Sequence, residues 1–79
     1  MNRSSRAEVR NPILQLPGAL ALRELDPETR EAISTALRSI QMDARARAEE
    51  CWRRHKAPMA CYWKAVSVYA GHLARAVRT

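Results

Sequence analysis

The C-terminal stretch, residues 58–78, is the feature that most constrains how this chain folds. Its polar positions recur every three or four residues, as on one face of an α-helix, and form one narrow stripe: Lys64, Ser67, Gly71, Arg75 and Arg78. Nearly every other position is apolar or small. A surface helix needs an apolar stripe of only about 100°. We therefore predict a helix that packs on more than one neighbour. If the rest of the chain does not cover all of its apolar surface, a second copy or another protein would bury the remainder.

A second, longer helix is predicted from residue 27 to about residue 54. The sequence Asp26-Pro27-Glu28 is a strong helix start, since Asp caps, Pro fits the first position and Glu favours the positive end of the helix dipole. A row of apolar and small residues with the α-helical period follows: Ile33, Leu37, Ile40, Ala44, Ala48 and Cys51. This row is the predicted core face of the helix.

Three positions bear on how these two helices are broken and joined. Asp43 is a point where the long helix can break, because Asp can cap a second segment. Pro58 disfavours helical geometry at Ala57, which places the turn at residues 55–57. Gly71 costs about 1 kcal/mol in a helix relative to Ala, so we expect a neighbouring backbone to approach closely there.

The N-terminal quarter is predicted to contribute a short helical segment. Residues 1–10 are polar and aperiodic and are predicted to form a flexible arm, while residues 11–79 form a single domain. Residues 13–25 are largely apolar, with a turn signal at Pro17-Gly18, and should cover part of the core in one or two helical turns. No alternating β-branched run is present. The expected fold is all-α, a long antiparallel helical hairpin with a short N-terminal helical segment packed across it.

The net charge of +6 is unevenly divided along the chain. Residues 1–50 hold eight Arg and eight acidic residues, whereas residues 51–79 hold no acidic residue. All of the excess charge lies on six cations, which we predict to bind a partner: Arg53, Arg54, Lys56, Lys64, Arg75 and Arg78. A one-sided charge attracts polyanions or an acidic protein face. The alternative is a solvated basic face that only aids solubility.

Three aromatic residues, Trp52, Tyr62 and Trp63, lie close in sequence to these cations. The mixture suits phosphate contacts with base stacking, and it equally suits the centre of a protein interface. Glu49 and Glu50 lie four residues before Arg53 and Arg54 and can pair with them. We expect the two tryptophans to pack in the core, and we keep all three aromatic residues as candidate anchors for a partner.

The cysteines and histidines do not assemble a convincing reactive site. Cys51, His55 and Cys61 resemble part of a zinc site, but His72 lies about 16 Å further along the helix, too far to be the fourth ligand. A cysteine nucleophile with His55 as base would lack an orienting acid, and the sequence has no phosphate loop. We expect no metal, no cofactor and no enzymatic activity. We expect the cysteines to be reduced and buried. A disulfide between Cys51 and Cys61 is the alternative that the sequence also permits.

Composition also bounds the compartment. No stretch reaches the roughly 18 apolar residues of a membrane span, and the basic start is not followed by the apolar run of a secretory signal. Two cysteines are too few for a secreted disulfide scaffold. We expect a cytoplasmic protein that does not bind a membrane. A helix-turn-helix DNA reader is disfavoured, because the turn holds no Gly and the second helix would begin with apolar residues.

In size and character the chain resembles the small non-enzymatic proteins of phages and mobile elements, among them the anti-CRISPR inhibitors. The resemblance spans the chain loosely and rests on no signature residues. It implies a charged surface that occupies a nucleic-acid-binding complex. The expected function is a binding protein whose basic C-terminal helix engages an acidic protein surface or a nucleoprotein complex and blocks it. The alternative is a small basic nucleic-acid-binding regulator that acts as a homodimer.

Overall fold

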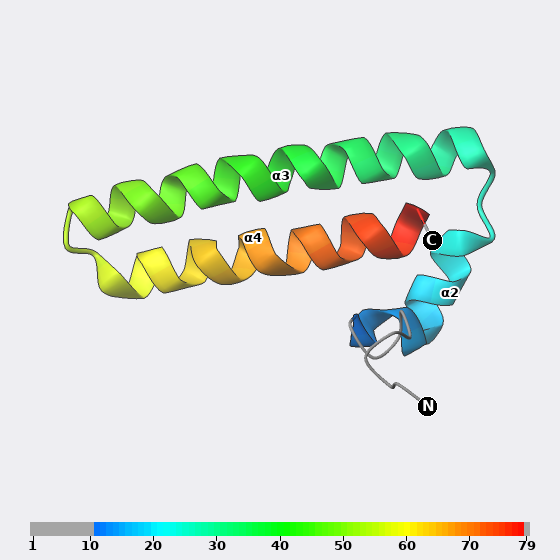
Figure 1. Cartoon of the computed structure of the whole chain (residues 1–79), viewed down its shortest axis with the longest axis horizontal. Helices are drawn as coiled ribbons and strands as arrows, with labels where there is room; N and C mark the ends of the chain where they lie inside the picture. The colour runs from blue at the N-terminus through cyan, green and yellow to red at the C-terminus, as the bar shows by residue number, and fades with distance from the viewer. Residues whose placement is uncertain (1–10, 79) are drawn as a thin grey trace, which may run out of the picture.

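The computed structural model describes residues 11–78, so the predicted arm over residues 1–10 lies outside the described residues, as does residue 79. The described chain consists of a 3-10 helix, η2 (Pro12–Gln15), and the α-helices α2 (Pro17–Arg23), α3 (Pro27–Arg53) and α4 (Ala57–Arg78). Helices α3 and α4 lie side by side and antiparallel, with η2 and α2 beside the C-terminal half of α4 (Figure 1). The predicted all-α hairpin, crossed by a short N-terminal segment, is confirmed.

Helix α3 begins where the sequence predicts and continues without interruption. The Asp26 carboxylate accepts hydrogen bonds from the Thr29 backbone N–H at 3.0 Å and from the Thr29 hydroxyl at 2.6 Å. These bonds, made to the charged form, hold the pKa of Asp26 below its ordinary value. The sequence left open a break at Asp43, and the helix does not break there. The Asp43 carboxylate instead pairs with Arg47 one turn later, at 3.6 Å, which a helix interior accommodates.

The turn between the long helices is a Schellman motif. His55 adopts the left-handed conformation, with φ of 59°. Its N–H donates to the Trp52 carbonyl at 3.1 Å, and the next N–H, of Lys56, donates to the Cys51 carbonyl at 2.8 Å. These are the two bonds that satisfy the last carbonyls of a helix ending in this way. The position is most often glycine, so His55 occupies a backbone conformation that costs it energy.

Helix α4 begins at Ala57, one residue before the predicted start. The Lys56 carbonyl accepts the first bond of this helix, from the Ala60 N–H at 2.9 Å. Pro58 is thus the second helical residue, where an N–H would have no partner within the helix anyway. The restriction that Pro58 places on Ala57 is a preference, and here the helix overrides it.

Small side chains form the contact between α3 and α4, which we call the small-residue seam. Its buried members are Ser34, Ala44 and Ala48 of α3 and Ala60, Ser67, Ala70, Gly71 and Ala74 of α4. The prediction that Ser67 and Gly71 lie on a solvated stripe was therefore wrong. The Ser67 hydroxyl donates to the Lys64 carbonyl at 2.7 Å, so this side chain can be buried without leaving a polar group unpaired.

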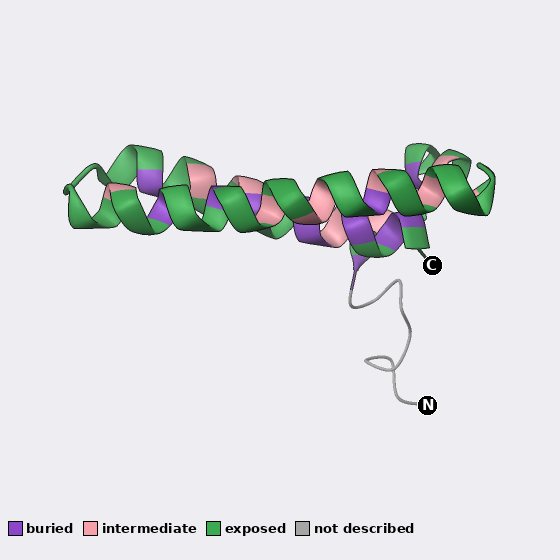
Figure 2. Ribbon diagram, turned by 90° about the horizontal axis from the view of Figure 1, so that it is seen from above, coloured by how far each residue is buried: buried purple, intermediate pink, exposed green. Residues whose placement is uncertain are grey.

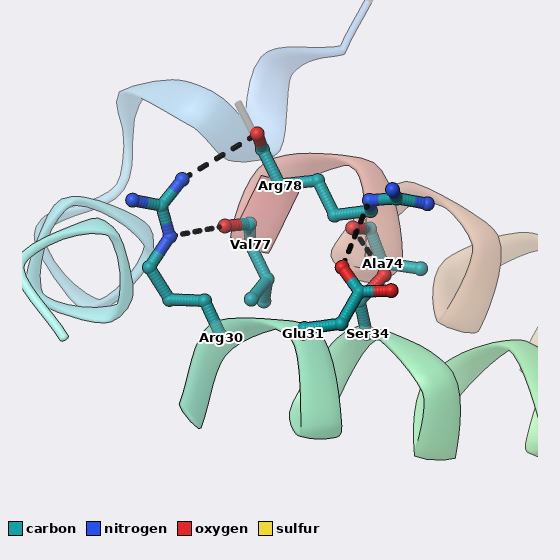
Figure 3. Close-up of polar contacts among 6 residues, drawn as sticks. All are labelled: Arg30, Glu31, Ser34, Ala74, Val77 and Arg78. Atoms are coloured by element: carbon teal, nitrogen blue, oxygen red, sulfur yellow. Dashed lines mark hydrogen bonds and ion pairs between the residues drawn. The ribbon is translucent and has the colours of Figure 1, made fainter. Parts of the chain in front are cut away.

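Polar cross-links hold the C-terminal end of α4 against the first turns of α3 (Figure 3). The Ser34 hydroxyl donates to the Ala74 carbonyl at 3.3 Å. Arg30 donates from Nε to the Val77 carbonyl at 2.9 Å and from Nη2 to the Arg78 carbonyl at 3.4 Å. The last carbonyls of a helix have no partner within it, so Arg30 caps α4 from the neighbouring helix.

The N-terminal segment covers one side of the C-terminal half of α4. Leu14 and Ala19 pack with Ala76 in an apolar cluster, and Ile13 packs against it. The Asn11 side-chain amide donates to the His72 carbonyl of α4 at 3.0 Å. The expectation that α4 needs several neighbours is thus met over this half of the helix.

Large apolar side chains lie mainly outside this packing. The largest fully buried side chains are Val77 and Ser34. Exposed large apolar residues occur on all three α-helices and on the connections around α2: Leu16, Leu20, Leu25, Ile40, Met42, Trp52, Met59, Tyr62, Val68 and Tyr69. Figure 2 shows exposed positions along both long helices. Ile40, predicted to face the core, is 48% exposed because the small-residue seam leaves no room for it.

Enlarging one residue of the seam tests how closely α3 and α4 must approach. Ala44 is 2% exposed, and we expect Ala44→Leu to lower the free energy of unfolding by about 1–3 kcal/mol, because the larger side chain separates the helices. Ala46→Leu, at an exposed position on the same helix, should stay within about 0.5 kcal/mol of the original. Urea unfolding at one protein concentration measures both, and equal effects would contradict a close seam.

The left-handed residue in the turn gives a second prediction. We expect His55→Gly to raise the free energy of unfolding by up to about 1 kcal/mol, because the strain of the left-handed conformation exceeds the cost of a more flexible unfolded chain. His55→Ala keeps the strain and should bring no gain. Thermal unfolding compares the two variants. A glycine variant no more stable than the alanine variant would show that the turn is not strained.

Candidate functional site

A shallow depression lies between α3 and α4, with a volume of about 180 Å³. Its lining comes from both helices: Gln41, Arg45, Lys64, Ser67, Val68, Gly71, His72 and Arg75. We call it the basic groove, because three of these residues are cations and none is acidic. All three cations, Arg45, Lys64 and Arg75, are exposed to solvent. The groove is therefore a place where a negatively charged group meets positive charge from both helices.

Helix periodicity and small residues together form this groove. Lys64, Gly71 and Arg75 are spaced by seven and four residues, which puts them on one side of α4. Gly71 leaves space for the Gln41 side chain, whose Nε2 would lie only 2.5 Å from a Cβ at position 71. We expected a neighbouring backbone to approach Gly71, but the nearest atoms belong to the side chain of Gln41, so that expectation was wrong. The side-chain Oε1 of Gln41 also accepts a hydrogen bond from Arg38 Nη1 at 3.0 Å.

Two of the six predicted cations are paired with a carboxylate at the end of α3. Arg53 and Arg54 both contact Glu50, the latter with its Nε 3.2 Å from a carboxylate oxygen. The hydrogen bond from Arg53, followed by its charge, holds the pKa of Glu50 below its ordinary value, and the pKa of Arg53 is raised in return. The pairing of Arg54 was predicted, whereas Arg53 contacts Glu50 and not Glu49. The Glu50 carboxylate therefore offsets part of the positive field of both arginines at this end of α3.

The other four cations lie in three separate places. Lys64 and Arg75 line the basic groove. Lys56 is exposed in the turn. Arg78 pairs with Glu31 at 3.6 Å at the opposite end of the hairpin (Figure 3). The polar stripe predicted for α4 is therefore not a continuous exposed surface, because its members Ser67 and Gly71 are buried against α3.

The aromatic residues divide between solvent and partial burial. Trp52 is 56% exposed, so its predicted place in the core was wrong; the narrow seam between the helices has no room for an indole. Trp63 is half-buried, with the edge of Tyr62 packed against it at 5.1 Å between ring centres. The Arg47 guanidinium lies 5.3 Å from the centre of the Trp63 ring, a cation–π contact.

Arg45 is the groove residue that the sequence reasoning missed. Residues 1–50 carry no net charge, so their arginines were set aside as a group. The spacing held a usable signal, because Arg38 and Arg45 are seven residues apart and share one side of the helix. Net charge summed along a segment conceals such a one-sided distribution.

The cysteines are both free, with Cys51 half-buried and Cys61 exposed. The prediction of two buried cysteines was therefore wrong for Cys61. Within residues 11–78, no three His, Cys, Asp or Glu side chains lie together as the ligands of a metal ion would. No helix of the same range has the length and apolar character needed to cross a membrane.

No protein-family model, no curated protein and no solved structure matches this chain. Any functional conclusion therefore depends on the chemistry of its own residues. Within residues 11–78, the lining of the basic groove combines three cations with no acidic side chain, and the proposal below starts from it.

The contact between Gly71 and Gln41 generates a prediction about the floor of the groove. Gly71→Ala gains about 1 kcal/mol of helix propensity but displaces the Gln41 amide and its bond to Arg38. The two effects should nearly cancel in the original protein. In a Gln41→Ala background, the same substitution should stabilise by about 1 kcal/mol. Thermal unfolding of the four proteins measures this coupling. The same effect in both backgrounds would show that Gln41 does not occupy this space.

Proposed function

We propose that this protein is a non-enzymatic binding protein whose basic groove engages an anionic surface, that of a nucleoprotein complex or an acidic protein. One observation carries the proposal. Arg45, Lys64 and Arg75 converge from two helices on a depression that no acidic side chain lines. Lys64 and Arg75 lie eleven residues apart, about 16 Å along α4, so the groove presents a row of positive charge to an anionic surface.

The dimensions of the groove favour the anionic groups of a larger partner over a complete small molecule. Pockets for drug-sized ligands usually have volumes of about 300–1,000 Å³, which exceeds the roughly 180 Å³ of this depression. Arginine binds phosphate or carboxylate in a bidentate manner, and lysine acts as a point charge beside it. The Gln41 amide, at the floor of the groove, supplies further hydrogen-bonding capacity. Because Lys64 and Arg75 are about 16 Å apart along α4, we expect them to contact different phosphates or carboxylates of one partner.

The mode of action that we propose is blocking of a larger nucleic-acid-binding machine. A chain of 79 residues that occupies an anionic surface excludes other basic proteins from it by charge and by volume. The resemblance in size and character to small phage inhibitors is in line with this role. The second candidate is a nucleic-acid-binding regulator that acts as a homodimer, which the exposed apolar residues of α4 favour.

Binding to polyanions at two salt concentrations tests the proposal. We expect the protein to bind labelled DNA, RNA or polyglutamate by fluorescence anisotropy at 50 mM salt and more weakly at 200 mM. The double variant Arg45→Ala, Lys64→Ala should weaken binding. On nucleic acid it should also reduce the slope of log K against log salt concentration by the equivalent of up to about two phosphate contacts. Binding only to polyglutamate would favour an acidic protein partner. Binding to nucleic acid would favour a nucleoprotein partner or the regulator over an acidic protein.

The matched control removes two cations that the structure pairs with a carboxylate. Arg53→Ala, Arg54→Ala loses as much charge as the groove variant but leaves the groove intact. It should weaken binding less than the groove variant does. The proposal is wrong if the two double variants behave alike, or if no polyanion binds at low salt.

A further inference from the structure

A second surface lies on the side of α4 that turns away from the basic groove. Its residues are spaced by three, four, three and four positions along the helix: Met59, Tyr62, Val66, Tyr69 and Leu73. We call them the apolar stripe, and none of them carries a charge. Tyr62 and Tyr69 are 56% and 60% exposed, and Met59 is 46% exposed. Val66 and Leu73 are half-buried.

The apolar stripe continues onto α3 as one face of the hairpin. Trp63 lies beside the stripe, and the contact between its ring and Arg47 places this side of α4 next to the Arg47 side of α3. Ile40, two turns before Arg47 on the same side of α3, is 48% exposed. The face opposite the basic groove therefore presents apolar residues from both long helices.

The spacing of the stripe indicates a helical partner. Apolar positions that alternate by three and four residues are the pattern with which one helix packs along another. Tyr and Met are enriched at protein interfaces, and a tyrosine can bury its ring while its hydroxyl stays at the wet rim. An exposed run of this kind marks an interaction surface more often than a solvated one.

Charge favours a second copy of this chain as that partner. Asp43 and Arg47, which border this face on α3, pair with each other at 3.6 Å, and the stripe itself is uncharged. The face is thus close to neutral and can meet its own copy without repulsion. The face that holds the basic groove is cationic and would repel its copy. Of these two faces, the apolar one is therefore the better suited to self-association.

The area of this face is sufficient for a dimer. A helix of 22 residues, such as α4, is about 33 Å long, and two helices packed 8–10 Å apart are roughly 20 Å wide. The face therefore offers about 600 Å² per chain, or about 1,200 Å² in total, the lower end of stable interfaces. Since Val77 and Ser34 are the largest fully buried side chains, such a dimer also supplies the second layer that a helical domain ordinarily has.

We propose that two copies of this chain dock through the apolar stripe and Ile40 into a four-helix bundle, with a basic groove on each outer face. The dimer itself does not depend on the proposed anion binding. If the groove does bind anions, the dimer has two binding sites. Its overall affinity is then higher for a partner that presents two anionic sites at a matching distance.

The mass of the full chain in solution tests the proposal. By light scattering and sedimentation we expect about twice the chain mass of 9.0 kDa at micromolar concentration. The double variant Tyr62→Glu, Tyr69→Glu should weaken association on the order of 100-fold, because two interface aromatics become charged. Met42→Glu is the matched control, since Met42 is 70% exposed but lies on α3 outside this face, and it should remain a dimer. Circular dichroism confirms that each variant is helical.

A labelling experiment on the original protein covers the case in which the double variant does not fold. Tyr62 and Tyr69 should be protected from tyrosine-modifying reagents at high protein concentration and become reactive on dilution. A monomer at all concentrations would overturn the proposal and leave the stripe to residues 1–10 or to a different protein. A dimer whose two tyrosines stay reactive would overturn it as well.

The two proposals fail in different ways. If the dimer is wrong and anion binding is right, the mass is that of one chain while the groove variant still loses polyanion binding. If anion binding is wrong and the dimer is right, Arg45→Ala, Lys64→Ala keeps the dimer mass and no polyanion binds.

Discussion

The close contact between α3 and α4 through alanine, serine and glycine is the constraint on which the rest of the structure depends. Ala44 and Ala74 are almost fully buried in it, and Ser34 can be buried there because its hydroxyl bonds to a carbonyl of the other helix. Small side chains bring two helices close together and bury little apolar area. The large apolar residues of the same helices are consequently displaced to the outer faces of the hairpin.

This displacement gives the hairpin two faces of different character. On one face, Gly71 admits the Gln41 side chain, and three cations surround the resulting depression. On the other, exposed tyrosine, methionine and isoleucine side chains lie around a half-buried tryptophan. The first face suits an anion and the second suits another helix. Both proposed uses follow from which sides of α3 and α4 meet.

The ends of the helices depend on local chemistry, and that is why the sequence predicts them closely. Asp26 caps α3 through two bonds to Thr29, and the turn at His55 closes through bonds made within six residues. Both devices are complete within two helical turns of the chain. The one-residue error at Ala57 arose because a rule about the residue before proline is a preference and not a prohibition.

Fold class, the two long helices and their antiparallel arrangement followed from the sequence alone, because helical periodicity and capping act between near neighbours along the chain. Which side of each helix is buried did not. Ser67 and Gly71 look like a solvated stripe in the sequence, yet they lie in the seam, while Trp52 and Ile40 look like core residues and are exposed. Arg45 lies in the basic groove only because α3 packs against α4 in this orientation. Periodicity says which residues share a side of a helix, but the fit of side-chain volumes between two helices decides which side turns inward.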